Sequence, residues 1–103
     1  MVRPMATKNE TDDQRFAALC KAVLSLKSED EAKRFLIDLC TPGEIKDFGE
    51  RWLIARLLAK GGMSYREISA LTGASTTTVG RVARFLEQEP HHGYKTILER
   101  TKP

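Results

Sequence analysis

The sequence predicts an all-α protein, a helical bundle that contains a helix-turn-helix. Hydroxyl side chains followed three residues later by Glu or Gln recur along the chain, and this pattern is the capping box that starts helices. Between these starts, apolar side chains recur every three or four residues, as they do on one face of a helix. Strand signals are weak, because the one β-branched run, residues 76–79, lies between stronger helix signals. The four boxes are Thr11 with Gln14, Ser28 with Glu31, Thr41 with Glu44, and Ser64 with Glu67.

Length and composition are those of one small globular domain. The chain has 103 residues, of which 41% are hydrophobic and 30% charged. We therefore expect a single helical domain over residues 11–103, preceded by a disordered N-terminal arm over residues 1–10. No apolar stretch reaches the roughly 18 residues of a membrane span, and the first ten residues lack the apolar core of a secretory signal. We expect a cytoplasmic protein without membrane contact.

Four helices are expected outside the helix-turn-helix. Two amphipathic ones are predicted over about residues 12–27 and 29–40, a third over about 42–59, and a short last one around 94–98. Pro42 fits the first position of the third helix, where its missing N–H costs nothing. The second half of that helix is apolar almost all round, which predicts burial on several sides. The apolar faces of the first three helices comprise Phe16, Leu19, Cys20, Val23 and Leu24, then Ala32, Phe35, Leu36, Leu39 and Cys40, then Trp52, Leu53, Ile54, Ala55, Leu57 and Leu58.

The sequence contains no recognisable catalytic or metal-binding pattern. Cys20 and Cys40 stand twenty positions apart on apolar faces, so we expect buried free thiols rather than metal ligands or a disulfide. His91 and His92 are adjacent, point in different directions on a helix and have no Cys, Asp or Glu partner at ligand spacing. No nucleophile–base arrangement and no phosphate-binding glycine loop can be recognised. We expect neither an enzyme nor a metal site.

A helix-turn-helix is expected over residues 64–88. Ser64 caps its first helix, and Ser75 caps its second, which runs to about Gln88. Between them, Gly73 supplies the positive φ that a tight turn requires. We expect the two helices to share a small core made of Ile68, Leu71, Val79, Val82 and Leu86.

The positive charge of the chain is confined to this part of the sequence. The net charge is +3, and residues 60–86 carry four basic side chains against one acidic one, a surplus of three. The rest of the chain is therefore neutral. Such a confined basic face attracts phosphate and predicts a nucleic-acid partner. The basic side chains are Lys60, Arg66, Arg81 and Arg84, and the acidic one is Glu67.

Burial of the apolar side chains turns a polar, basic face outward. Small hydroxylated side chains near the start of a helix allow close approach to base edges in the major groove. Arginines and helix-terminal amides can hold phosphates. We therefore predict that the protein binds double-stranded DNA through Ser64, Tyr65, Arg66, Ser75, Thr76, Thr77, Gly80, Arg81 and Arg84.

A second interpretation is a protein-interaction module, which docks the helix-turn-helix onto a transcription complex without reading DNA by itself. The confined basic face favours DNA. The two interpretations differ in salt dependence, because phosphate binding weakens steeply with salt whereas apolar docking does not.

Residues 39–86 resemble the central region of the Trp repressor family. The overall length and the N-terminal pattern are most similar to its Trp repressor-like YerC/YecD group. The resemblance rests on Thr41-Pro42, Gly49 and Arg51, Leu57-Leu58, Gly62-Met63-Ser64, Arg66-Glu67, Gly73-Ala74 and Arg81. It implies an interwoven homodimer that reads a two-fold symmetric site and represses transcription. The apolar helical faces agree with this architecture, since they offer more apolar surface than one short chain readily buries.

The resemblance also implies an effector pocket with Thr41, Arg51 and Arg81, which in the family meet the carboxylate and indole of the corepressor. Two further pocket positions, a glycine and a serine in the family, are Val82 and Phe85 here. These larger side chains fill the space for an indole. We therefore expect no tryptophan binding and no resident cofactor. An anionic small molecule is the class of effector that the two arginines can bind.

Overall fold

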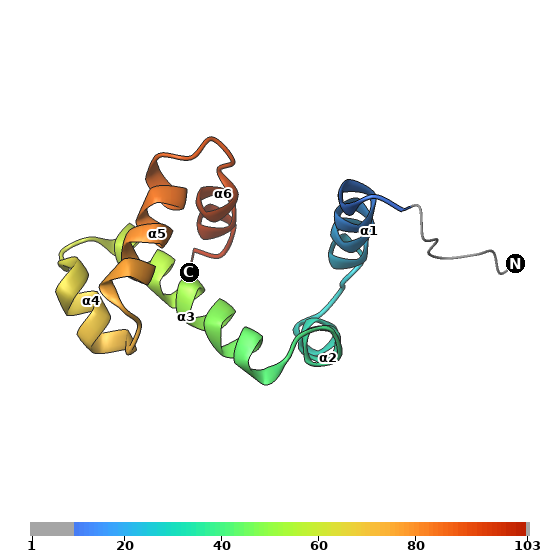
Figure 1. Cartoon of the computed structure of the whole chain (residues 1–103), viewed down its shortest axis with the longest axis horizontal. Helices are drawn as coiled ribbons and strands as arrows, with labels where there is room; N and C mark the ends of the chain where they lie inside the picture. The colour runs from blue at the N-terminus through green and yellow to red at the C-terminus, as the bar shows by residue number, and fades with distance from the viewer. Residues whose placement is uncertain (1–9, 103) are drawn as a thin grey trace, which may run out of the picture. The chain divides into compact units, whose positions relative to one another are not determined.

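The computed structural model describes residues 10–102, and within this range it contains six helices and no strand (Figure 1). The helices are α1 (Asp12–Leu24), α2 (Glu29–Leu39), α3 (Pro42–Lys60), α4 (Tyr65–Thr72), α5 (Thr76–Glu87) and α6 (Gly93–Arg100). The prediction of an all-α protein is confirmed, as is the short last helix. None of these helices is both long enough and apolar enough to cross a membrane.

Contacts divide the chain into two compact units, one that holds α1 and α2 and ends at Leu39, and one that begins at Cys40 and holds α3 to α6. The expected single domain over residues 11–103 stays a prediction. The expected disordered arm, residues 1–10, lies outside the described residues except for Glu10.

The capping boxes start the helices where the sequence predicts. Thr11, Thr41 and Ser64 each accept the N–H of the residue three positions on, and the side chain of that residue accepts the N–H of the cap. At Ser28 only one half of the box is present, because Oε1 of Glu31 accepts the N–H of Lys27 instead, at 3.0 Å. The four helices nevertheless begin at the residue after the predicted cap.

The apolar side chains of α1 and α2 are largely exposed within the described part of the first unit. Neither α1 nor α2 contains a buried residue, and the side chains of Phe16 and Leu24 are 66% and 86% exposed. The expectation of two buried thiols is therefore wrong for Cys20, which is exposed, while Cys40 is half-buried.

Helix α1 ends three residues earlier than expected, at Leu24 instead of about residue 27. The hydroxyl of Ser25 donates to the carbonyl of Ala22 at 2.7 Å, which closes the last turn. The N–H of Lys27 donates to Glu31 of the next helix and not to a carbonyl of α1.

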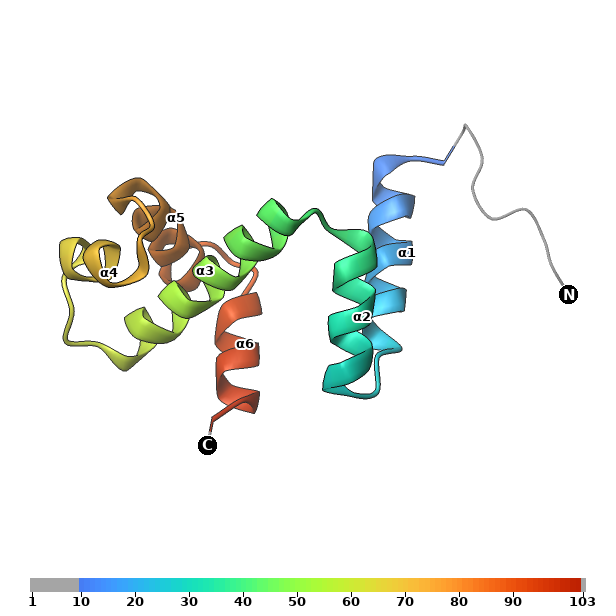
Figure 2. The same cartoon turned by 90° about the horizontal axis from the view of Figure 1, so that it is seen from below.

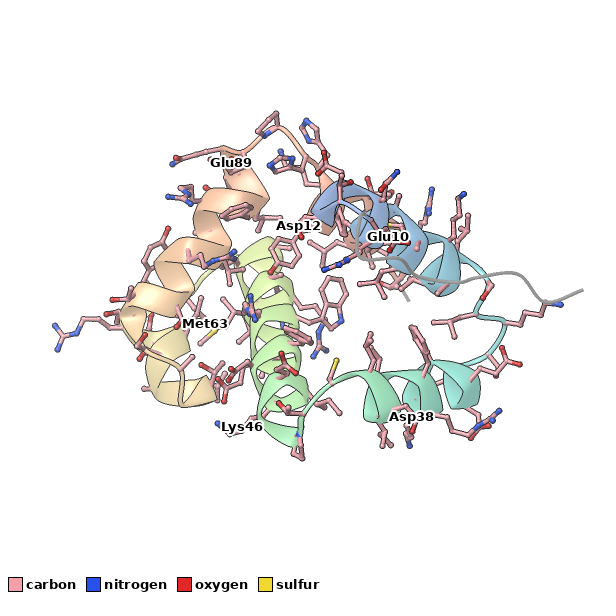
Figure 3. All side chains as sticks on the ribbon, turned by 45° about the vertical axis from the view of Figure 1, so that its right-hand side comes forward. Glu10, Asp12, Asp38, Lys46, Met63 and Glu89 are labelled. Carbon is pink, nitrogen blue, oxygen red and sulfur yellow. The ribbon has the colours of Figure 1, made fainter. Side chains whose placement is uncertain are left out.

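The core of the second unit lies where α3, α4 and α5 meet. All three helices contact one another, and α6 contacts α3 and α5; Figures 1 and 2 both show α4 and α5 beside the C-terminal half of α3. The buried cluster consists of Ile54, Ala55, Ile68, Ala74, Val79 and Val82. Met63, labelled in Figure 3, packs against it from the link between α3 and α4. The predicted burial of the second half of α3 on several sides is confirmed by Ile54 and Ala55.

Candidate nucleic-acid interface

The turn between α4 and α5 is fixed by backbone geometry and by two hydroxyls, those of Ser69 and Thr72. Gly73 lies in the left-handed region, with φ 81° and ψ −5°, so the predicted glycine turn is confirmed. Its N–H donates to the carbonyl of Ser69 at 2.9 Å. The hydroxyl of Thr72 donates to the carbonyl of Ile68 at 2.8 Å and accepts the N–H of Ala74 at 3.2 Å. These bonds set where α5 begins relative to α4.

The small core between the two helices contains four of the five side chains expected there. Ile68, Val79, Val82 and Leu86 are buried, but Leu71 is 64% exposed, so its assignment to the core is wrong. The inward face of α4 runs through Ile68 and the half-buried Ser69 and Thr72, whose hydroxyls bind the backbone of the turn. At 100° per residue, Leu71 then lies on the flank of the helix.

The side chains predicted to bind DNA lie on the outside of this helix pair. Val79, Val82 and Leu86 turn the opposite face of α5 into the core. All the predicted DNA-binding residues are exposed except Gly80, which is half-buried. A Cβ atom at Gly80 would meet no atom within 4 Å, so the helix surface is open there. This exposed set is Ser64, Tyr65, Arg66, Ser75, Thr76, Thr77, Arg81 and Arg84.

Two of these hydroxyls have structural tasks as well. The Oγ atoms of Ser64 and Ser75 accept the N–H groups of Glu67 and Thr78, each at 3.1 Å. Both serines therefore hold the first turns of their helices. Thr76 and Thr77 make no side-chain hydrogen bond within the described residues, so their hydroxyls are available to a ligand.

The basic charge on this face is largely uncompensated by the protein. Within residues 10–102, Arg66 and Arg81 form no ion pair. Arg84 lies near Glu89, with 3.8 Å between Nε and Oε2, but the arginine side chain is exposed and such a pair contributes little. The face therefore presents guanidinium groups to solvent, as a phosphate-binding surface requires.

The residues expected to form an effector pocket are divided among different places. Arg51 and Arg81 line one cavity of about 240 Å³, here called the polar cavity, together with Asp47, Glu50 and Thr78. Val82 is 0% exposed and belongs to the core. Thr41 caps α3, and its hydroxyl accepts the N–H of Glu44 at 3.1 Å.

Two carboxylates of the polar cavity were not predicted from the sequence. Asp47 precedes Arg51 by four positions on α3, and this spacing was the available signal, whereas Glu50 directly precedes Arg51 and its spacing gave none. Glu50 also accepts from Nζ of Lys46 at 2.8 Å, and this hydrogen bond raises the pKa of Lys46. The polar cavity therefore offers opposite charges, two guanidinium groups and two carboxylates.

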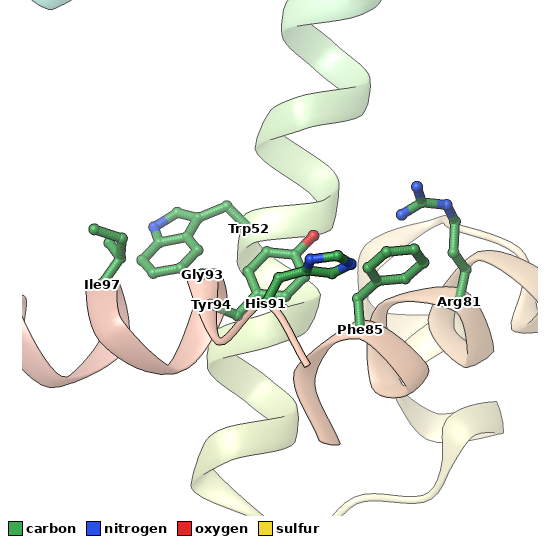
Figure 4. Close-up of a pocket in the computed structure, with 7 residues that line it drawn as sticks. All are labelled: Trp52, Arg81, Phe85, His91, Gly93, Tyr94 and Ile97. Carbon is green, nitrogen blue, oxygen red and sulfur yellow. The ribbon is translucent and has the colours of Figure 1, made fainter. Parts of the chain in front are cut away.

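Phe85 lines a different space, the aromatic cavity of about 440 Å³ shown in Figure 4. The rings of Trp52 and Tyr94 stack there with centroids 6.4 Å apart, and those of Phe85 and His91 with centroids 6.1 Å apart. No spacing in the sequence indicated that Tyr94 and His91 would come close to Phe85. The cavity is lined by Trp52, Arg81, Phe85, His91, Gly93, Tyr94 and Ile97.

Comparison with known proteins gives one consistent family. A family model described as Trp repressor protein matches residues 14–102. The uncharacterized protein YerC of Bacillus subtilis (strain 168) is 42% identical over 84 residues, which are 82% of this chain and 79% of that relative. Two solved structures are also similar. A TrpR-like protein from Eubacterium eligens ATCC 27750 has a TM-score of 0.78 at 39% identity and covers 90% of this chain and 94% of that one. A candidate Trp repressor from Staphylococcus aureus has a TM-score of 0.74 at 36% identity and covers 84% of each chain.

Proposed function

We propose that this chain, which belongs to the Trp repressor family, is a cytoplasmic repressor that binds a specific duplex DNA site as a homodimer. The family is one of DNA-binding regulators of transcription. The observation that carries the finer proposal is the exposed basic face around Arg66, Arg81 and Arg84, where Arg84 alone has an ion pair within residues 10–102. Because a regulator of this kind binds without chemistry, the proposal assigns the chain no catalytic step.

The residues of this basic face divide into those that read bases and those that bind phosphates. Thr76 and Thr77 lie in the first turn of α5, and their hydroxyls make no hydrogen bond within residues 10–102. Gly80, one turn further on, leaves room for a base edge. Arg66 at the start of α4 joins this set. Arg84 lies nearer the end of α5 and serves phosphate affinity, while Arg81 also borders both cavities and can serve DNA or an effector.

Apolar surface on α1 and α2 supports the homodimer. Monomeric soluble proteins seldom expose large contiguous apolar patches, and such patches usually mark interfaces. A two-fold symmetric dimer then reads two half-sites about one helical turn of DNA apart. The large apolar side chains exposed on these two helices are Phe16, Leu19, Val23, Leu24, Leu36, Ile37 and Leu39.

The proposal excludes tryptophan as the effector. Val82 is fully buried in the core of the helix pair, and the ring of Phe85 lies against the guanidinium of Arg81. An anionic small molecule stays the proposed class, with Arg51 and Arg81 as its ligands in the polar cavity. Asp47 and Glu50 in the same lining favour an effector that also carries a cationic group. No metal and no resident cofactor is part of the proposal.

Selection of bound duplexes from a random pool with the purified protein tests this function directly. We expect enrichment of a two-fold symmetric sequence, with binding that weakens steeply as salt rises. The alternative is a module that docks onto a transcription complex without reading DNA. It predicts no enriched sequence and only a shallow salt dependence, and that result would refute the proposal.

A further inference from the structure

The ring of Phe85 lies next to two arginines of the DNA-binding face. The Cζ atoms of Arg81 and Arg84 are 4.4 and 5.0 Å from the ring centroid, both within the range of a cation–π contact. Figure 4 shows the guanidinium of Arg81 beside the ring. One aromatic side chain thus contacts two of the three arginines on the exposed face.

Other neighbouring side chains hold the ring of Phe85 in place. It is half-buried, and the imidazole of His91 stacks on it with an interplanar angle of 15°. His91 is in turn 3.6 Å from Glu89, the carboxylate that lies 3.8 Å from Arg84. In Figure 4, Phe85 lies between Arg81 and His91, and all three line the aromatic cavity. Phe85 is therefore packed against its neighbours and is not a freely rotating surface side chain.

Stacking restrains an arginine without using its hydrogen-bond donors. An exposed arginine has large rotamer freedom, which it loses when it binds a phosphate. A guanidinium that lies on an aromatic face keeps its N–H edge available for a bidentate phosphate contact. Part of the entropy cost of ordering the two arginines is then met before DNA binds, and this raises the affinity for DNA.

We propose that Phe85 is a positioning residue that holds Arg81 and Arg84 ready to bind DNA phosphates. This inference rests on the proposed function, because it assumes that the two arginines meet DNA. It adds to that function the residue that supports the arginine pair, which is Phe85. DNA binding then requires no small molecule to order these arginines.

The test compares Phe85→Leu and Phe85→Tyr in the full-length protein on the duplex chosen by selection. Phe85→Leu leaves two arginines to be ordered only when DNA binds, which corresponds to about a 5- to 150-fold weaker Kd. Phe85→Tyr keeps the aromatic face and should restore binding to within about 2-fold of the wild type. Equal affinity of the leucine variant and the wild type would overturn the inference.

A second experiment tests whether Phe85 acts only through the fold. It repeats Phe85→Leu in a protein that also carries Arg81→Gln and Arg84→Gln. Without the arginines, the leucine substitution should change Kd by less than about 2-fold, since interacting residues are not additive. An undiminished loss in this background would show that Phe85 acts through the fold and would overturn the inference. If Phe85→Leu unfolds by circular dichroism, Phe85→Met takes its place in both arms. A wild-type protein that binds no duplex refutes the proposed function and this inference together.

Discussion

Ser64 and Glu67 satisfy each other at the start of α4. The N–H of Glu67 donates to Oγ of Ser64 at 3.1 Å, and the N–H of Ser64 donates to Oε1 of Glu67 at 2.8 Å. This reciprocal pair opens the helix-turn-helix, so it links the stability of the fold to the position of the DNA-binding face. Two predictions concern this pair.

Ser64→Ala should lower the free energy of unfolding by about 1 kcal/mol, because it leaves an N–H of the first turn without its acceptor. Urea denaturation of the two proteins measures the difference. Thr77→Ala is the matched control, since Thr77 is exposed on the next helix and its hydroxyl makes no hydrogen bond to any described residue. Equal losses in the two variants would contradict a capping role for Ser64.

Acidification should weaken the box at Glu67. Hydrogen bonds from Ser64 hold the pKa of this carboxyl below its ordinary value of 4.5. A lowered folded pKa means that the stabilisation is present above pH 4.5 and is lost as pH falls through the folded pKa. Glu67→Gln keeps the acceptor, as Gln14 does for Thr11, but cannot titrate. The wild type should therefore lose more stability than this variant between neutral and acidic pH, and parallel losses would disprove the linkage.

Thr77 and Arg84 should differ in the kind of DNA binding that they support. Thr77→Gln should change the preferred base pair at one position, with a discrimination of about 1–3 kcal/mol. Arg84→Gln should weaken all duplexes alike and reduce the salt slope by about one unit. Selection and salt titration measure both, with Lys95→Gln on α6 as a control for lost positive charge. An unchanged site preference in the Thr77 variant, with its fold intact, would remove Thr77 from the base-reading set.

L-tryptophan should not bind. Insertion of an indole beside Val82 and Phe85 requires overpacking of about 1–3 kcal/mol or more, which is one to two decades of affinity. Calorimetric titration, with and without the selected duplex, should give no saturable binding at micromolar ligand. Micromolar binding that tightens DNA affinity would show that these two side chains move aside.

Light scattering should give twice the chain mass of 11.6 kDa at micromolar concentration. Phe16→Asp should yield the single-chain mass, because it places a charge on the exposed apolar face of α1. Lys21→Ser changes an exposed residue of the same helix and should leave the dimer intact. A folded wild-type monomer at this concentration would count against the dimer and against a two-fold symmetric site.

Helix starts were predictable from the sequence because their signals are local. A cap such as Ser64 and its partner three residues on lie within one turn, so their chemistry is visible without the fold. The exposure of Leu71 and Cys20 was not predictable, because spacing identifies an apolar face but not what covers it. Nor could spacing show that Phe85 approaches His91 and Tyr94, which depends on how the chain turns back after α5.

The uncovered face of α1 has a consequence for the amount of protein in the cell. With Phe16 and Leu24 largely exposed in a lone chain, the proposed dimer makes folding and association one mass-action process. The stability of α1 and α2 then rises with chain concentration and falls on dilution at constant temperature. Copy number would act as a threshold, below which a newly synthesised chain stays without a partner and contributes nothing to repression.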